Sequence, residues 1–89
     1  MLEREVEIIN KLGLHARAAA KLVSCASSFS VDVTISFKAQ SVDAKSIMSV
    51  MLLAASKGSL VTIRCDGRDE QAAMDGVTEL IANRFGEAE

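Results

Sequence analysis

The chain has 89 residues, of which 49% are hydrophobic, and a formal net charge of −2 at pH 7. This length predicts one domain, residues 1–89, with one packed core. The negative charge argues against nucleic acid as a partner. A membrane-spanning helix needs about 20 consecutive apolar residues, and no apolar run in the chain is that long. The charged start, Met1–Glu5, shows no signal peptide, so we expect a cytoplasmic protein without membrane insertion. Cys25 and Cys65 lie far apart and are expected to be buried, reduced thiols.

The spacing of apolar residues changes twice in the first half of the chain. Strict alternation over residues 3–9 predicts a half-buried strand, and Gly13 suits a turn after it. A spacing of three and four residues then predicts a helix over residues 16–27, before alternation returns in a strand over 31–37. A short third strand is expected over 41–43. The apolar face of the helix consists of Ala19, Leu22, Val23 and Ala26.

The second half of the chain repeats this change of spacing. Ser46 is a favoured N-cap residue and begins a predicted helix over residues 47–55, which Lys57–Gly58 is expected to end. Alternation over residues 60–65 predicts a fourth strand, and a last helix follows Asp69 and ends near Gly86. The predicted core face of that helix carries Ala73, Val77, Leu80 and Ile81.

The predicted order of elements is β-α-β-β-α-β-α. A right-handed crossover makes the first two strands parallel and leaves room for the fourth strand, antiparallel, between them. The fold class is therefore α+β, an open-faced β-sandwich in which three helices cover one face of a four-stranded antiparallel sheet. The polar residues of the strands suit an uncovered second face.

His15, the only histidine, lies between the glycine-containing turn and the start of the first helix. The first backbone amides of a helix lack intrahelical acceptors, so those of Ala16, Arg17 and Ala18 are free to bind an anion. The Arg17 guanidinium adds a planar donor suited to phosphate oxygens. Position alone also fits a plain N-cap or a surface histidine, so this reasoning leaves both interpretations open.

Two segments resemble the signatures of a known family. Asn10–Arg17 is similar to the active-site signature of the HPr family of phosphocarriers, and Lys45–Met48, with the apolar helix and Lys57–Gly58, resembles its second signature. The resemblance implies that His15 accepts phosphate at Nδ1 from phospho-enzyme I, itself charged by phosphoenolpyruvate, and passes it to IIA proteins of sugar transport. It implies that Arg17 assists the transfer, and neither a cofactor nor a metal is expected.

The chain departs from this family at a position beside the predicted site. Many members carry proline where this chain has Ala18, and alanine keeps the amide hydrogen that proline lacks. We therefore expect the Ala18 amide to contact the phosphate or its water shell, together with Ala16 and Arg17.

The second helix carries more apolar residues than one core-facing stripe needs. Val50 and Leu53 suit the core, whereas Ile47, Met48 and Met51 suit an exposed surface that binds partners. A fully buried helix is the alternative. By resemblance, docking of enzyme I and IIA proteins occurs here, and the chain is expected to be a monomer.

Ser46 has two interpretations that are compatible. It caps the second helix, and by resemblance it is the regulatory serine modified by HPr kinase/phosphorylase in many bacteria.

Two other functions of the chain also stay open. One is the nitrogen-branch paralogue NPr, with the same chemistry and a regulatory acceptor, and the other is a binding module in which His15 is never phosphorylated.

Overall fold

The computed structural model describes residues 1–89 and contains one four-stranded sheet, three α-helices and a short 3-10 helix. Every strand pair is antiparallel, and the strand order is β1-β4-β2-β3, so β4 lies between β1 and β2 as predicted. The predicted fold class is confirmed. The strands are β1 (Leu2–Glu7), β2 (Asp32–Phe37), β3 (Gln40–Asp43) and β4 (Leu60–Asp66), and the helices are α1 (Ala16–Ser27), α2 (Ile47–Leu52), α3 (Glu70–Ala82) and η1 (Arg84–Gly86).

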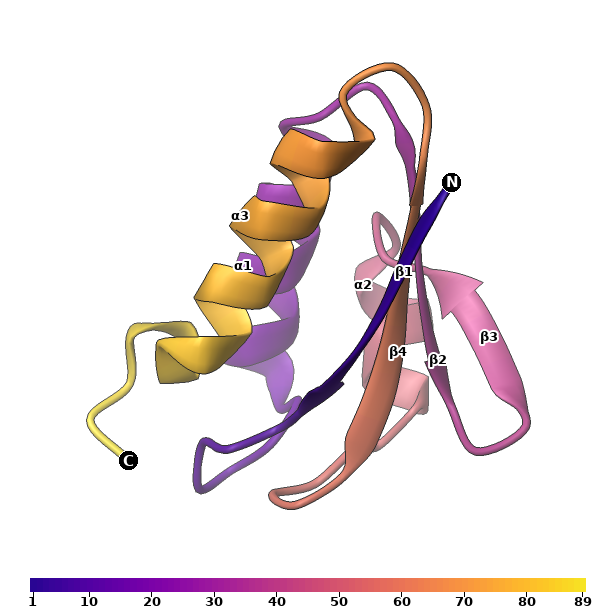
Figure 1. Cartoon of the computed structure of the whole chain (residues 1–89). Helices are drawn as coiled ribbons and strands as arrows, with labels where there is room; N and C mark the ends of the chain where they lie inside the picture. Colours follow the sequence, from indigo (N-terminus) through magenta and orange to yellow (C-terminus); the bar gives the residue numbers. More distant parts are fainter.

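The helices cover one face of the sheet, and α1 and α3 lie side by side on it (Figure 1). Alternation along the strands sends one set of side chains into this layer, where Val33, Ile35, Val61 and Ile63 are buried. The other set, such as Thr62 and Arg64 of β4, lies on the uncovered face. A single core cluster of 21 buried residues joins the sheet to the helices.

Helix α2 is shorter than predicted. It ends at Leu52 instead of continuing to Ala55, and Ala54 adopts a left-handed backbone with φ 53°. This turn lets both Leu53 and Ala55 enter the core, and the Ala55 carbonyl accepts a hydrogen bond from the Leu14 amide at 2.9 Å. Packing against the loop before α1 therefore ends the helix before Gly58 is reached.

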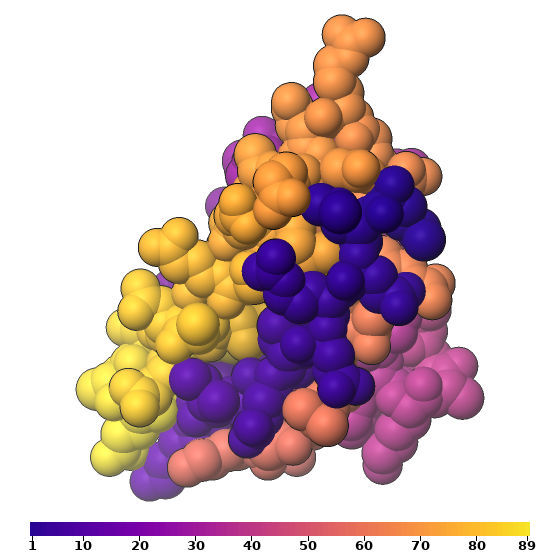
Figure 2. All heavy atoms as spheres, viewed as in Figure 1, coloured from indigo at the N-terminus to yellow at the C-terminus, as the bar shows by residue number.

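The C-terminal part also differs from a single long helix. Helix α3 ends at Ala82, and η1 follows with Arg84, Phe85 and Gly86 all at positive φ. This left-handed turn returns residues 87–89 to the loop that precedes α1, and Figure 2 shows the yellow end of the chain against that dark purple segment.

Both cysteines are free thiols, Cys65 buried and Cys25 partly buried, and burial raises the pKa of each. None of the helices combines the length and the apolar character needed to cross a membrane.

Candidate functional site

His15 is the N-cap residue of α1. Its backbone is extended, with φ −73° and ψ 177°, and its Nδ1 accepts a hydrogen bond from the Arg17 amide at 3.3 Å. The His15 carbonyl accepts the first intrahelical bond, from the Ala19 amide at 2.8 Å. The imidazole thus replaces the side-chain oxygen that usually caps a helix, and 27% of the side chain is exposed.

The loop before His15 is fixed by close backbone packing. Gly13 has φ 65°, and a Cβ at this position would lie 2.6 Å from the Ala55 carbonyl oxygen. Only glycine combines this conformation with so close an approach of two backbones. The predicted turn therefore sets the start of α1, and His15 with it, against the segment that follows α2.

The predicted phosphate-binding residues follow His15 directly in the chain, and the Arg17 amide contacts its ring. Ala16, Arg17 and Ala18 form the first turn of α1 and precede the Ala19 amide that makes the first intrahelical bond. Ala16 and Arg17 are exposed, whereas the whole of Ala18 is buried, which argues against the predicted contact between its amide and a phosphate. Arg17 forms no ion pair, so its guanidinium is free to meet an incoming anion.

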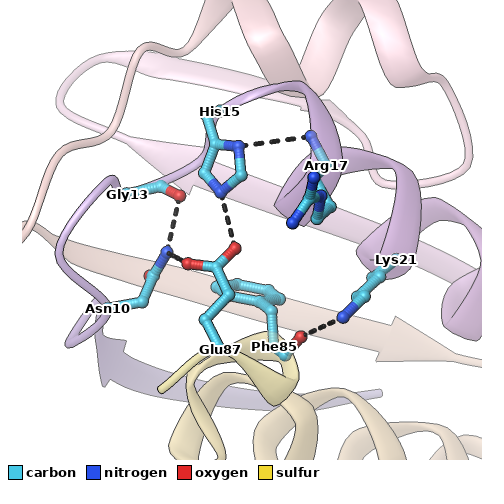
Figure 3. Close-up of polar contacts among 7 residues, drawn as sticks. All are labelled: Asn10, Gly13, His15, Arg17, Lys21, Phe85 and Glu87. Carbon is cyan, nitrogen blue, oxygen red and sulfur yellow. Dashed lines mark hydrogen bonds and ion pairs between the residues drawn. The ribbon is translucent and has the colours of Figure 1, made fainter. Parts of the chain in front are cut away.

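Glu87 is the residue that sequence reasoning missed. Its Oε2 lies 2.5 Å from Nε2 of His15, although 72 positions separate the two residues in the chain. Its Oε1 accepts a hydrogen bond of 3.1 Å from Nδ2 of Asn10, which also donates to the Gly13 carbonyl at 2.8 Å. Figure 3 shows the carboxylate between the Asn10 amide and the imidazole ring. The signature residues and the C-terminal segment thus form one site.

A left-handed turn holds Glu87 in this position. Arg84 and Phe85 have φ 57° and 54°, which costs about 1–2 kcal/mol for each residue that is not glycine. The Phe85 side chain is fully buried, and burial of a phenylalanine contributes about 1.5–3 kcal/mol. The Lys21 ammonium also donates to the Phe85 carbonyl at 2.7 Å. Packing and this hydrogen bond therefore oppose the strain in the turn.

The environment keeps Glu87 ionised. Only 14% of its side chain is exposed. The hydrogen bond from Asn10, and next the contact with His15, hold the pKa of Glu87 below its ordinary value. At neutral pH the imidazole therefore faces a carboxylate.

A surface hollow of about 720 Å³ opens above these groups. Its walls come from the loop before α1, the first turn of α1 and the C-terminal segment, and both cationic and anionic side chains line it. The residues include Lys11, Leu12, His15, Ala16, Arg17 and Glu87. The hollow gives an approaching group access to His15.

The apolar residues of α2 divide between core and surface as predicted. Val50 and Leu53 are buried, whereas Met48 is 67% exposed. We call the exposed residues Ile47, Met48, Met51 and Leu52 the α2 patch. Leu52, at 75% exposure, is an addition that the sequence did not single out.

Ser46 caps α2 through its hydroxyl group. The Ser46 Oγ accepts a hydrogen bond of 3.4 Å from the Ser49 amide, and its hydroxyl donates to the Ser49 Oγ at 3.0 Å. The predicted N-cap is confirmed, and the side chain is half-buried.

Comparison with known proteins identifies the family. A family model described as the PTS HPr component phosphorylation site matches residues 2–83. The chain belongs to the HPr family. The phosphocarrier protein HPr of Cupriavidus necator is 61% identical over 89 residues, which cover 100% of both chains. The phosphocarrier protein NPr of Shewanella violacea is 41% identical over 98% of this chain and 96% of its own.

A solved HPr structure has the same architecture. The crystal structure of HPr-C-His from Thermoanaerobacter tengcongensis superposes with a TM-score of 0.96 and 43% identity over 100% of both chains. As a member of the HPr family, the chain is a phosphocarrier of the phosphotransferase system. Glu87 lies beyond the residues that the HPr family model matches.

Proposed function

We propose that the chain accepts a phosphoryl group on Nδ1 of His15 from phospho-enzyme I and passes it to IIA proteins. The contact between the Arg17 amide and Nδ1 carries this proposal. An amide N–H can only donate, so Nδ1 bears a lone pair, and a lone pair is what a nucleophile needs. The Arg17 amide, a hydrogen-bond donor, lies beside Nδ1, where the oxygens of an arriving phosphoryl group would be.

The transfer exchanges one bond to phosphorus for another. The Nδ1 lone pair attacks phosphorus, the bond from phosphorus to the donor atom of phospho-enzyme I breaks, and its electron pair stays with enzyme I. The phosphate oxygens then meet the Arg17 amide and guanidinium, together with the Ala16 amide at the positive end of the helix dipole. When the phosphoryl group passes to an acceptor, the bond between phosphorus and Nδ1 breaks again. His15 therefore acts as a relay.

Labelling with phosphoenolpyruvate and purified enzyme I tests this function. The chain is expected to gain acid-labile phosphate and to lose it when a IIA protein is added. A chain that gains no phosphate in the presence of active enzyme I would instead be a binding module.

A parallel comparison of sugar-branch and nitrogen-branch enzyme I separates HPr from NPr activity. The higher identity to an HPr predicts faster labelling by the sugar-branch enzyme.

The α2 patch is proposed as the docking surface for these partners. Replacing Met48 and Met51 with serine is expected to weaken enzyme I binding about tenfold or more, because each methionine loses apolar surface that a partner would cover. Leu60→Ser is the matched control, since Leu60 is 54% exposed on the uncovered face of the sheet. Isothermal titration calorimetry measures both affinities. Equal affinities for the two variants would place docking elsewhere.

Phosphorylation of Ser46 is proposed to slow this transfer. A phosphate at this position would break the hydroxyl hydrogen bond to Ser49 and place negative charge beside the apolar α2 patch. The chain carrying phosphoserine is therefore expected to accept phosphate from enzyme I more slowly than the unmodified chain. Stopped-flow or quench-flow labelling compares the two, and equal rates would leave Ser46 with only its capping role.

A further inference from the structure

The two nitrogens of the His15 ring have neighbours with opposite roles. Nδ1 faces the Arg17 amide, which can only donate, and Nε2 faces the Glu87 carboxylate, which in its ionised form can only accept. Both contacts therefore favour the same tautomer, with the proton on Nε2 and the lone pair on Nδ1. In proteins, the hydrogen bond made by one ring nitrogen of a histidine commonly determines which nitrogen carries the proton.

The Glu87 carboxylate is held from several sides. Asn10, fully buried, donates to its second oxygen, and the Lys21 ammonium fixes the turn through the Phe85 carbonyl (Figure 3). The Lys11 amide donates to the backbone oxygen of Glu89 at 2.8 Å, which holds the segment on the other side of Glu87 in place. Non-glycine residues in left-handed conformations persist only where their surroundings impose them, and such strain is found at functional sites.

We propose that Glu87 is a positioning residue for phosphoryl transfer, holding the proton on Nε2 so that Nδ1 of His15 presents its lone pair. This inference rests on the proposed function. It assigns a role in the transfer to a C-terminal segment that lies outside the matched family residues.

Glu87 also balances charge during the reaction. When Nδ1 forms its bond to phosphorus, the ring keeps the proton on Nε2 and becomes an imidazolium. The carboxylate at 2.5 Å faces the positive charge as it develops. When the phosphoryl group leaves for an acceptor, the electron pair of the broken bond returns to Nδ1. The proton stays on Nε2 throughout, so no base has to remove it.

Glu87→Gln tests the role, because it keeps the shape of the side chain and removes its charge. Nitrogen NMR of the 15N-histidine-labelled chain, at about pH 8.5, where histidines are ordinarily neutral, reports which ring nitrogen is protonated. We expect a protonated Nε2 and a bare Nδ1 in the unmodified chain, and a mixture of tautomers in the variant. Transfer from phospho-enzyme I is expected to slow about tenfold, because a bond to a charged acceptor becomes a bond to a neutral one.

Two further variants make the result specific. Glu79→Gln removes the same charge from the exposed surface of α3 and is expected to match the unmodified chain in both measurements. Glu87→Asp keeps the charge with a side chain one methylene shorter, and its rate is expected to lie between those of the unmodified chain and Glu87→Gln. A purely structural role would lower stability without changing the tautomer.

The outcomes separate this inference from the proposed function. An unmodified chain that accepts no phosphate from active enzyme I contradicts the proposed function itself. An unmodified chain that is phosphorylated, with Glu87→Gln equal to it in both tautomer and rate, overturns only the role of Glu87.

Discussion

Replacing His15 with alanine or with asparagine is expected to abolish phosphate acceptance, whereas the alanine variant should lose more stability than the asparagine variant. His15 both caps α1 and presents the lone pair at Nδ1. Asparagine is among the best N-cap residues, so it preserves the cap without the nucleophile, and alanine at an N-cap costs about 0.5–2 kcal/mol. Labelling by enzyme I and urea unfolding measure the two effects separately.

This pair of variants distinguishes a nucleophile from a capping histidine. If His15 were only a cap, the asparagine variant would be phosphorylated as well as the unmodified chain. Label retained in either variant would show that another residue takes the phosphate. Equal stability of all three proteins would show that the imidazole contributes nothing as a cap.

Gly13→Ala is expected to lower the free energy of unfolding by about 3 kcal/mol. The left-handed conformation costs alanine about 1–2 kcal/mol, and the new methyl carbon would lie 2.6 Å from the Ala55 carbonyl oxygen and 2.8 Å from the Ser56 Cα. Relief of that contact requires the two loops to separate, which strains the bond from the Leu14 amide to the Ala55 carbonyl. His15 should move with its loop, so phosphate acceptance should slow as well.

Gly58→Ala is the matched control for this prediction. Gly58 also has a positive φ, 91°, but no atom lies within 4 Å of the place where an alanine methyl would sit. The Gly58→Ala variant should therefore lose about 1–2 kcal/mol of unfolding free energy, from backbone strain alone. Chemical denaturation that gives equal losses for both variants would contradict the close loop packing beside His15.

Local patterns were sufficient to predict much of this molecule. Alternating and helical spacing predicted the order of the elements, and with the crossover rule they placed β4 between β1 and β2. The cap at Ser46 and the exposure of Met48 also followed from neighbours within a few residues. These features depend on short-range preferences that the sequence displays directly.

The features that were missed depend on contacts between distant segments. The early end of α2 results from packing of Ala55 against the loop before His15, and nothing within the helix signals it. The position of Glu87 requires Arg84 and Phe85 to adopt left-handed backbones, which is unusual for such residues. The apolar Phe85 followed by Gly86 was the hint in the sequence that the chain turns back after α3.

One measurement tests the central claim most directly, namely the bond between phosphorus and Nδ1 of His15. The chain is labelled with 15N-histidine, phosphorylated by enzyme I and phosphoenolpyruvate, and examined by 31P and 15N NMR. We predict a coupling between phosphorus and Nδ1 of His15, with Nε2 still protonated beside Glu87. Coupling to Nε2, the nitrogen that now contacts the Glu87 carboxylate, or phosphate on any other residue would contradict the account.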